Sequence, residues 1–203
     1  MEKKKLGILV SGNGSNLQAI LDAVAKGKLN GEVAVVISNK PQVYALERAS
    51  IAGITTTYIE EKSGETRTEY DQKLLETLAD YQVDLVILAG FMRLLSPAFI
   101  QKYQGRIMNI HPSLLPAFPG LDAQQQAFDY GVKVTGATVH FVDEGLDSGP
   151  IIIQSPTLVQ PDDTVETLRE RILRVEHWIY PQAIKLYLEG KLRIEGNKVV
   201  VEK

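Results

Sequence analysis

The sequence predicts an α/β protein built on a doubly wound, Rossmann-like sheet, and three observations predict it. Short apolar runs rich in β-branched residues alternate with helical patterns in the first half of the chain. Most of these runs are almost continuously apolar, which is typical of strands that a parallel sheet buries on both faces. The second half holds longer runs that partly alternate between apolar and polar residues. We therefore expect a sheet that is parallel in the N-terminal half and mixed with antiparallel strands in the C-terminal half.

Five apolar runs in the first half predict strands. They cover residues 6–10, 33–38, 55–60, 83–90 and 106–111. Segments with apolar residues at helical spacing separate these runs, at residues 16–27, 44–53 and 67–81 and in a short helix from Pro97. Because crossovers between parallel strands are right-handed, this alternation favours a doubly wound order.

The second half changes character. Residues 132–142 and 150–159 predict two more strands, and one long helical pattern follows at residues 162–190. Pro181 is an expected kink in that helix, because a proline in a helix interior removes a backbone hydrogen bond. The tail predicts a small hairpin around Gly196 and Asn197.

The composition is that of an ordinary globular protein. Of 203 residues, 44% are hydrophobic and 23% are charged, and no linker or repeat divides them, so we expect a single domain over residues 1–203. The absence of cysteine excludes disulfides and cysteine-bound metals. A net charge of −3 argues against a nucleic-acid partner. The first apolar run is too short for a signal peptide or a membrane span, so we expect a cytoplasmic protein without a membrane partner.

A glycine-rich stretch, SGNGSNLQAI, joins the first strand to the first helix. Gly12 and Gly14 let the backbone approach a ligand, and the N–H groups of the first helical turn favour an anion such as phosphate. We expect Ser15 and Asn16 to cap the helix and to donate hydrogen bonds. The stretch is a poor dinucleotide fingerprint, because Leu17 stands where a third glycine belongs. The alternative is a glycine turn without a ligand.

Asn109 and His111 stand at the end of the strand at 106–111, where open α/β sheets bind ligands. Because they are two residues apart on an extended strand, their side chains point to the same face. An amide donor beside an imidazole can polarise a carbonyl group. The alternative is a buried histidine satisfied by backbone groups, beside a turn asparagine that bonds its own backbone.

An acidic turn lies between the two strands of the second half. It contains Asp143, Glu144 and Asp147, one of which can orient an imidazole and favour its charged form. A solvated turn and a metal site are the alternatives, although one such loop is a poor ligand set. No Gly-x-Ser-x-Gly motif is present, so acid–base chemistry on a carbonyl group is favoured over a serine nucleophile.

Taken together, these segments resemble the phosphoribosylglycinamide formyltransferase family, the folate-dependent enzymes of purine synthesis. The stretches SGNGSNLQAI, AGFMRLLS, NIHPSLLPAFPG, GATVHFVDEGLDSGPII and EHWIYP occur in the family's order and at its usual spacing, over nearly the whole chain. The resemblance implies formyl transfer from 10-formyltetrahydrofolate to the amine of glycinamide ribonucleotide. It also implies that both substrates are small molecules and that no metal takes part.

The resemblance also implies a role for individual residues. The matching catalytic residues are Asn109, His111 and Asp147. The matching substrate-binding residues are Gly14, Ser15 and Asn16 for the phosphate and Glu176 for the ribose. The matching folate-binding residues are Arg67, Met92, Arg93, Leu94, Leu95, Asn109, Asp143, Glu144, Gly145, Leu146 and Asp147. Residues 1–105 then form a phosphate-binding half, and residues 106–203 form a catalytic and folate-binding half.

Each binding match has an ordinary alternative. Met92 and Leu95 fit a hydrophobic core, Arg67 a helix-surface charge, and Glu176 the acidic face of a helix. The sequence also departs from some family members at two places. Those members carry histidine just after FPGL, where this chain has Asp122 followed by alanine and glutamine. They also carry histidine at position 135, where this chain has threonine. These departures put an auxiliary imidazole in doubt but leave the three catalytic matches intact.

Other activities remain as rivals. Two related enzymes, methionyl-tRNA formyltransferase and formyltetrahydrofolate deformylase, share the HPSLLP chemistry. Methionyl-tRNA formyltransferase has a further C-terminal domain and a basic face that binds tRNA, and we expect neither here. Formyltetrahydrofolate deformylase has an N-terminal regulatory domain, which we also do not expect here. A non-catalytic phosphosugar-binding module would use the glycine loop alone. A dehydrogenase is disfavoured, because the acidic residue that binds the ribose is missing after the second strand, which ends ISNK.

Overall fold

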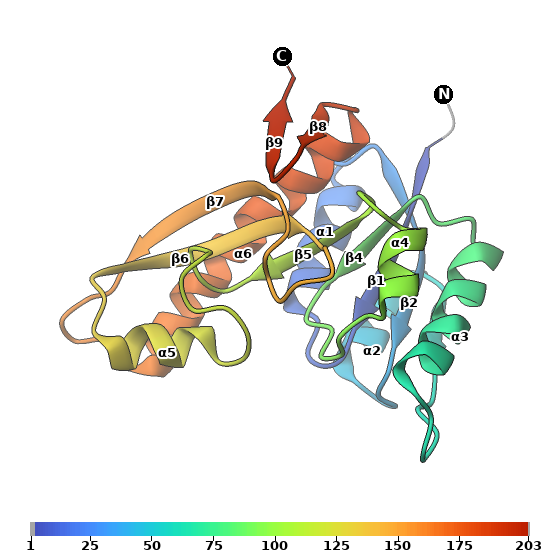
Figure 1. Ribbon diagram of the computed structural model, residues 1–203, viewed down its shortest axis with the longest axis horizontal. Helices are drawn as coiled ribbons and strands as arrows, with labels where there is room; N and C mark the ends of the chain where they lie inside the picture. Colours follow the sequence, from blue (N-terminus) through green and yellow to red (C-terminus); the bar gives the residue numbers. More distant parts are fainter. Residues whose placement is uncertain (1–2, 203) are drawn as a thin grey trace. The chain divides into compact units, whose positions relative to one another are not determined.

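The computed structural model describes residues 3–202 and has an α/β fold with a mixed sheet (Figure 1). The chain divides into two compact units, one that runs up to Met108 and one that starts at Asn109. The division falls inside strand β5 (Ile107–His111), close to the expected boundary between the two halves. The single domain itself stays a prediction. Among residues 3–202, no helix is both long and apolar enough to cross a membrane.

The first unit is a parallel sheet flanked by helices. Its strands β1 (Lys4–Val10), β2 (Gly31–Ser38), β3 (Thr56–Tyr58) and β4 (Leu85–Leu88) lie in the order β3-β2-β1-β4. Its helices are α1 (Ser15–Ala25), α2 (Tyr44–Ile51), α3 (Arg67–Asp80) and α4 (Pro97–Lys102). β1 pairs in parallel with β2 and β4, and β2 pairs in parallel with β3. Every residue of β4 is buried, which explains its wholly apolar sequence.

The second unit carries the antiparallel pairs. It contains the end of β5, the strands β6 (Val134–Phe141), β7 (Ile151–Leu158), β8 (Leu192–Glu195) and β9 (Lys198–Val201), and the helices α5 (Ala123–Tyr130) and α6 (Val165–Leu188). The strand order is β5-β6-β7-β9-β8. β6 and β7 are antiparallel, β8 and β9 form the antiparallel hairpin, and α6 packs against β6 and β7.

These elements confirm the predicted fold class and the change from parallel to antiparallel pairing. Two details differ. β3 and β4 are shorter than their apolar runs, because the ends of those runs lie in loops. Helix α5 was not expected from the sequence: it buries only the small side chains of Ala123 and Ala127, so it lacks the large apolar stripe that predicts a helix. Pro181 lies inside the continuous helix α6, and the kink stays a prediction.

Candidate active site

In the first unit, the glycine turn leads directly into helix α1. Gly14 is the N-cap residue, with φ of 76°, and the helix begins at Ser15. No side chain caps the helix at Gly14, so the expectation that Ser15 and Asn16 cap it was wrong: both residues belong to the first turn. The helix begins one residue earlier than that expectation requires, because Gly14 occupies the N-cap position with a left-handed backbone that residues with side chains disfavour. The first turn therefore starts without an oxygen from the N-cap side chain.

The turn is held rigidly against helix α2. Arg48 donates from Nε to the carbonyl of Asn13 at 2.9 Å and from Nη2 to Oδ1 of Asn13 at 3.0 Å. The N–H of Ala45 donates to the carbonyl of Gly12 at 3.1 Å. A Cβ atom on Gly14 would lie only 2.6 Å from the Cβ of Ala45. Close packing as well as the positive φ therefore requires glycine at position 14.

The segment 92–95 is attached to the same turn. The N–H of Met92 donates to Oγ of Ser11 at 2.8 Å, and Ser11 in turn donates to Oδ1 of Asn39 at 2.6 Å. Met92 and Leu94 are 66% and 58% exposed, whereas Leu95 is buried. The core alternative therefore holds for Leu95 but not for Met92. Two exposed apolar side chains beside a fixed backbone are available to an apolar ligand.

The side chain of Arg93 has a structural role. It forms an ion pair with Glu61, and its guanidinium lies 4.0 Å above the ring centre of Tyr70. Burial raises the pKa of Tyr70 to about 12, and the hydroxyl donates to the carbonyl of Ile59 at 3.1 Å. The backbone of Arg93 is thus the part left to bind a ligand. Arg67, also predicted to bind folate, is exposed at the start of α3.

In the second unit, the three predicted catalytic residues come together. Asn109 and His111 lie on β5, and Asp147 lies in the turn between β6 and β7. Nδ1 of His111 is 3.3 Å from Oδ2 of Asp147, and both side chains are largely buried, at 5% and 13% exposure. Oδ2 of Asp147 also accepts the N–H of Gly120 at 2.8 Å. The carboxylate is therefore fixed between an imidazole and a backbone donor.

Both ring nitrogens of His111 face oxygen atoms. Nδ1 faces Asp147, and Nε2 lies 2.8 Å from the carbonyl oxygen of Phe118. A carbonyl and an ionised carboxylate only accept hydrogen bonds, so the ring can donate to both only as the imidazolium. Phe118 holds its carbonyl there with a left-handed backbone, at φ of 53°. The proline-rich segment after β5 and the turn between β6 and β7 thus each place one acceptor against His111.

A second histidine, His140 on β6, joins the cluster. Its Nδ1 lies 2.8 Å from the carbonyl of Phe141, and its Nε2 lies 3.3 Å from Nδ2 of Asn109 and 3.8 Å from Oδ1 of Asp147. Burial is the main reason that the pKa of His140 is lowered; the Phe141 carbonyl and Asp147 oppose this. A neutral ring that donates from Nδ1 accepts from Asn109 at Nε2. His140 thereby orients the Asn109 amide.

Sequence reasoning missed His140 as a site residue. The sequence held a clue to its role: only three histidines occur, and His140 lies in the stretch GATVHFVDEG that leads into the acidic turn. Its strand is almost wholly buried, so a satisfied core histidine was the ordinary interpretation. Only the pairing of β6 beside β5 brings the ring to Asn109.

The acidic turn itself is built by local hydrogen bonds. Oδ1 of Asp143 accepts the N–H of Gly145 at 3.1 Å and the hydroxyl of Ser148 at 2.8 Å. Asp147 has a φ of 50°, a conformation that turns its carboxylate toward His111. Leu146 is 56% exposed, and its Cδ2 would lie 3.5 Å from a Cβ on Gly120. An apolar side chain therefore lies beside the carboxylate of Asp147.

The remaining predicted residues of the turn and of α6 differ in exposure. Glu144 and Gly145 are exposed. Glu176 lies on α6 and is 6% exposed, so it is not the solvated helix-face acid that the ordinary alternative describes. Among residues 3–202, no group of three or more histidine, aspartate and glutamate side chains is arranged to hold a metal ion.

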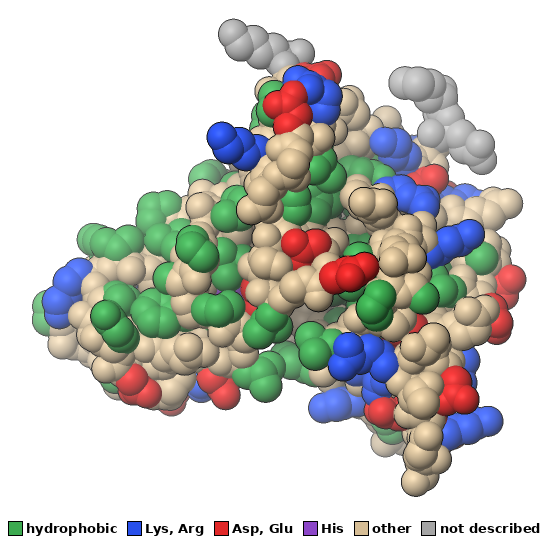
Figure 2. Space-filling model, in the orientation of Figure 1, with side chains coloured by type: hydrophobic (Ala, Val, Ile, Leu, Met, Phe, Trp, Pro, Cys, Tyr) green, Lys and Arg blue, Asp and Glu red, His purple; other side chains and the backbone are tan. Residues whose placement is uncertain are grey.

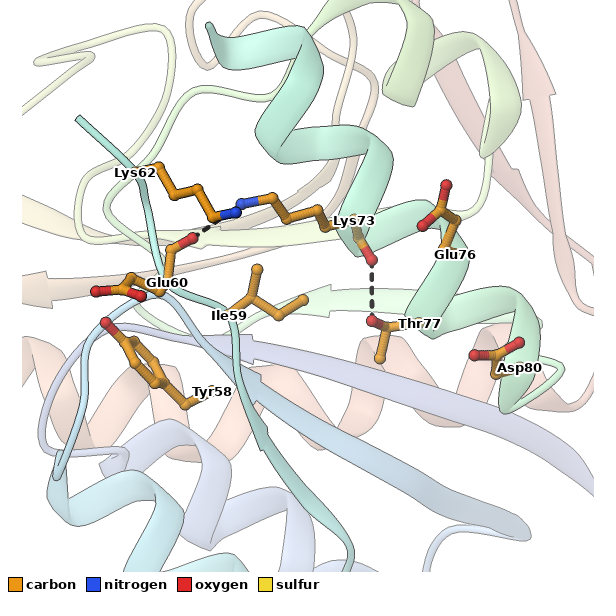
Figure 3. A pocket seen from close by; sticks show the side chains of 8 residues that line it. All are labelled: Tyr58, Ile59, Glu60, Lys62, Lys73, Glu76, Thr77 and Asp80. Atoms are coloured by element: carbon orange, nitrogen blue, oxygen red, sulfur yellow. Dashed lines mark hydrogen bonds between the residues drawn. The ribbon is translucent and has the colours of Figure 1, made fainter. Parts of the chain in front are cut away.

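A shallow pocket in the first unit contains none of the predicted site residues. It has a volume of about 420 Å³ and is lined by Tyr58, Ile59, Glu60, Lys62, Lys73, Glu76, Thr77 and Asp80 (Figure 3). The ammonium of Lys73 already contacts Glu65 at 2.6 Å and the carbonyl of Glu60 at 3.1 Å. The charge of Lys73 is thus balanced by neighbouring oxygens.

The second unit also exposes apolar side chains. They gather over α5 and the strands β6 and β7 in Figure 2, where Tyr130 is 80% and Leu158 60% exposed. Leu158 lies opposite Val134, which is 46% exposed, at the end of the β6–β7 pair. The ring of Phe118 packs edge-on against Tyr130, at 5.8 Å between centres, so this surface continues to the segment that faces His111.

The comparisons with known proteins agree with this arrangement. The sequence pattern of the formyl transferase family matches residues 4–184. Phosphoribosylglycinamide formyltransferase of Escherichia coli is 45% identical over 190 residues, which cover 94% of this chain and 90% of that protein. The crystal structure of glycinamide ribonucleotide transformylase 1 from Symbiobacterium toebii is 52% identical, with a TM-score of 0.97 over 99% of this chain and 95% of that chain.

A longer relative is also similar. The trifunctional purine biosynthetic protein adenosine-3 of Drosophila melanogaster is 48% identical over 93% of this chain, which spans only 14% of that protein's length. The similarity to the two shorter proteins covers nearly all of each of them. Since the family pattern matches residues 4–184 and the Escherichia coli relative is 45% identical over 90% of its own length, this chain belongs to the formyl transferase family.

Proposed function

We propose that this chain transfers a formyl group from 10-formyltetrahydrofolate to the amine of 5'-phosphoribosylglycinamide, a reaction of de novo purine biosynthesis. One observation carries the proposal: the match to phosphoribosylglycinamide formyltransferase extends over 90% of that protein. The cluster of Asn109, His111 and Asp147 supports it, because acyl transfer needs a donor for the developing oxyanion and a group that takes up a proton.

In this reaction the substrate amine attacks the formyl carbon, whose carbonyl oxygen becomes an oxyanion. The bond from that carbon to N10 of the folate then breaks, N10 takes a proton, and the amine loses one. Nδ2 of Asn109 carries two N–H groups. One is directed at His140, and we assign the other to the oxyanion. Removing such a donor typically lowers the rate by about 10²–10³-fold.

His111 and Asp147 supply charge and a proton acceptor. As the imidazolium, His111 stabilises the oxyanion through its positive charge. Because Nε2 donates to the Phe118 carbonyl, His111 acts through this charge and not through a direct hydrogen bond to the oxyanion. Asp147 balances the charge of His111 and takes up the proton that the amine releases, directly or through water.

We assign substrate binding by unit. In the first unit, Gly14, Ser15 and Asn16 bind the phosphate at the start of α1, and the backbone of residues 92–95 with Arg67 binds the folate. In the second unit, residues 143–147 bind the folate and Glu176 binds the ribose. Three observations support these assignments: the glycine N-cap of α1 brings no side-chain oxygen, Met92 and Leu94 are exposed, and Leu146 is exposed.

We further propose a cytoplasmic protein that acts on small molecules alone. The net charge of −3 supports the absence of a nucleic-acid partner, because phosphate backbones attract basic surfaces. Lys/Arg and Asp/Glu side chains are interspersed on the face of the first unit that Figure 2 shows, without a basic stripe.

The test is an assay of the purified protein with both substrates and with each alone. We expect tetrahydrofolate and the formylated amine to form in equal amounts, and only when both substrates are present. The variant His111→Ala should lose at least about 10²-fold in kcat while its circular dichroism spectrum stays that of the parent. Release of formate from the folate in the absence of the amine would instead indicate a deformylase. Binding of both substrates without turnover would indicate a binding module.

A further inference from the structure

The segment from Ser113 to Gly120 provides two of the groups that hold the catalytic pair. The carbonyl of Phe118 faces Nε2 of His111 at 2.8 Å, and the N–H of Gly120 donates to Asp147 at 2.8 Å. Phe118 has the left-handed backbone that non-glycine residues rarely adopt. Such a conformation persists only where surrounding contacts impose it. The contacts that hold this segment therefore decide where the two groups lie.

Four of those contacts come from one cross-strand pair, beside the local bond from Ser113 to the carbonyl of Ala117 and the ring contact between Phe118 and Tyr130. Thr138 on β6 and Gln154 on β7 lie directly opposite each other in the antiparallel register. Oγ1 of Thr138 accepts the N–H of Leu115 at 3.0 Å and donates to the carbonyl of Ser113 at 2.7 Å. Nε2 of Gln154 donates to the carbonyl of Leu115 at 2.8 Å and to Oγ1 of Thr138 at 3.0 Å. The backbone of Leu115 is thus held at both its N–H and its carbonyl.

Thr138 and Gln154 differ in burial, so a change at each residue has a different effect on the stability of the fold. Thr138 is fully buried, so removing its hydroxyl would leave buried backbone groups unsatisfied and would destabilise the fold. Gln154 is exposed and its hydrogen bond to the carbonyl of Leu115 is only partly buried, so water can take the place of its amide. A change at Gln154 therefore alters the support of the segment with little change in folding free energy.

We propose that Gln154 is a positioning residue for His111. Its amide, donating to the carbonyl of Leu115, restrains residues 113–118 so that the Phe118 carbonyl stays against Nε2 of His111. The inference rests on the proposed function for its effect on catalysis. Its effect on the His111 ring does not depend on that function and can be measured separately.

Without the Gln154 amide, the segment samples positions in which Phe118 no longer accepts from His111. Fewer molecules then hold the arrangement of His111 and Asp147, so kcat falls. Binding of the substrates changes little, because Gln154 is not among the residues that we assign to binding. The loss of one hydrogen bond between an exposed side chain and the backbone corresponds to about a threefold to tenfold loss in kcat. The Nε2–H proton of His111 also exchanges faster with water.

The experiment compares Gln154→Met, which keeps the length of the side chain and removes the donor, with Gln125→Met. Gln125 lies on α5, and within residues 3–202 its amide donates only to Asp129 of the same helix, at 2.9 Å, so it makes the matched control. Gln154→Glu is a second variant that keeps the shape but presents an acceptor to the Leu115 carbonyl. The readouts are kcat and KM, the thermal midpoint, and the ¹⁵N and ¹H resonances of the His111 ring in ligand-free protein.

We expect both Gln154 variants to lower kcat threefold or more, to leave each KM within about twofold, and to broaden the His111 Nε2–H signal. The control should match the parent in every readout. An unchanged His111 signal in both Gln154 variants would overturn the proposal, whatever happens to kcat. An equal loss in Gln125→Met would overturn it as well. If the parent protein fails to transfer formyl groups, the proposed function fails, and the His111 signals still decide the positioning role.

Discussion

Asp147 and His111 meet at 3.3 Å, between Oδ2 of the carboxylate and Nδ1 of the ring, and the same oxygen accepts the N–H of Gly120. The aspartate reaches this place through a left-handed backbone at the end of a turn. The histidine is held from the opposite side by the carbonyl of Phe118. The pair is therefore fixed on both partners before any substrate arrives, which is the condition for electrostatic preorganisation.

The first prediction concerns this carboxylate. Asp147→Asn keeps the size of the side chain and removes its charge, so His111 loses its charged partner and the amine loses a proton acceptor. We expect kcat to fall by about 10²–10⁴-fold, measured by steady-state formyl transfer. Asp129→Asn, at an exposed position on α5, is the matched control and should retain parental turnover. A kcat for Asp147→Asn within threefold of the parent would remove Asp147 from the mechanism.

The second prediction concerns the pH dependence of stability. Burial lowers the pKa of His140, so the unfolded chain binds a proton at a higher pH than the folded chain does. The free energy of unfolding should therefore fall as the pH is lowered from 7 through 6.5 toward the folded pKa. His140→Gln, which stays neutral, should lose that part of the slope in urea titrations at a series of pH values. The other titratable groups that act on this ring, His111, Asp147 and Asp143, remain in both proteins. An identical slope in the variant would therefore show that His140 does not cause the pH dependence.

The third prediction tests the glycine turn. Gly14→Ala places a Cβ 2.6 Å from the Cβ of Ala45, on a residue with φ of 76°. We expect the free energy of unfolding to fall by about 1–3 kcal/mol, measured by urea denaturation. Gly12→Ala is the control, because its Cβ would meet nothing within 4 Å and its backbone is not left-handed. Equal losses in the two variants would mean that packing against α2 does not decide the residue at position 14.

The fourth prediction concerns the start of helix α6. Arg171 forms two hydrogen bonds to Asp163, at 2.5 and 2.6 Å, and donates to the carbonyl of Leu158 at 2.8 Å. The hydrogen bonds from Arg171 are the main reason that the pKa of Asp163 lies well below its usual value of 3.8. This lowered pKa adds stability above pH 3.8, and that stability is lost as the pH falls below this value.

Arg171→Met removes that contribution at neutral pH. The variant should therefore be less stable than the parent at pH 7, and the difference should shrink as the pH falls below 3.8, as followed by thermal unfolding at each pH. Arg174→Met is the control, because Arg174 is 79% exposed and lies 3.9 Å from Glu170. A constant difference between Arg171→Met and the parent at every pH would show that the ion pair with Asp163 does not carry the effect.

Much of the fold could be predicted from local pattern. The buried runs of β1, β2 and β4 and the periodic helices α1, α3 and α6 carry strong signals, because the parallel sheet and the long helices bury large apolar side chains. Helix α5 buries only alanines and gave no such signal. The capping of α1 was predicted wrongly, because residue types that cap helices stand next to a glycine whose backbone takes the cap position instead.

The sequence by itself determined the residue types of the candidate site, the end of the strand on which Asn109 and His111 stand, and the family resemblance, because these depend on neighbours along the chain. The tertiary structure alone decided that Asp147 contacts His111, that His140 orients Asn109 and that Gln154 reaches Leu115. These contacts join segments far apart in the sequence. They depend on strand order and register, which no local pattern encodes, since a shift of one residue in a strand reverses the face of every side chain.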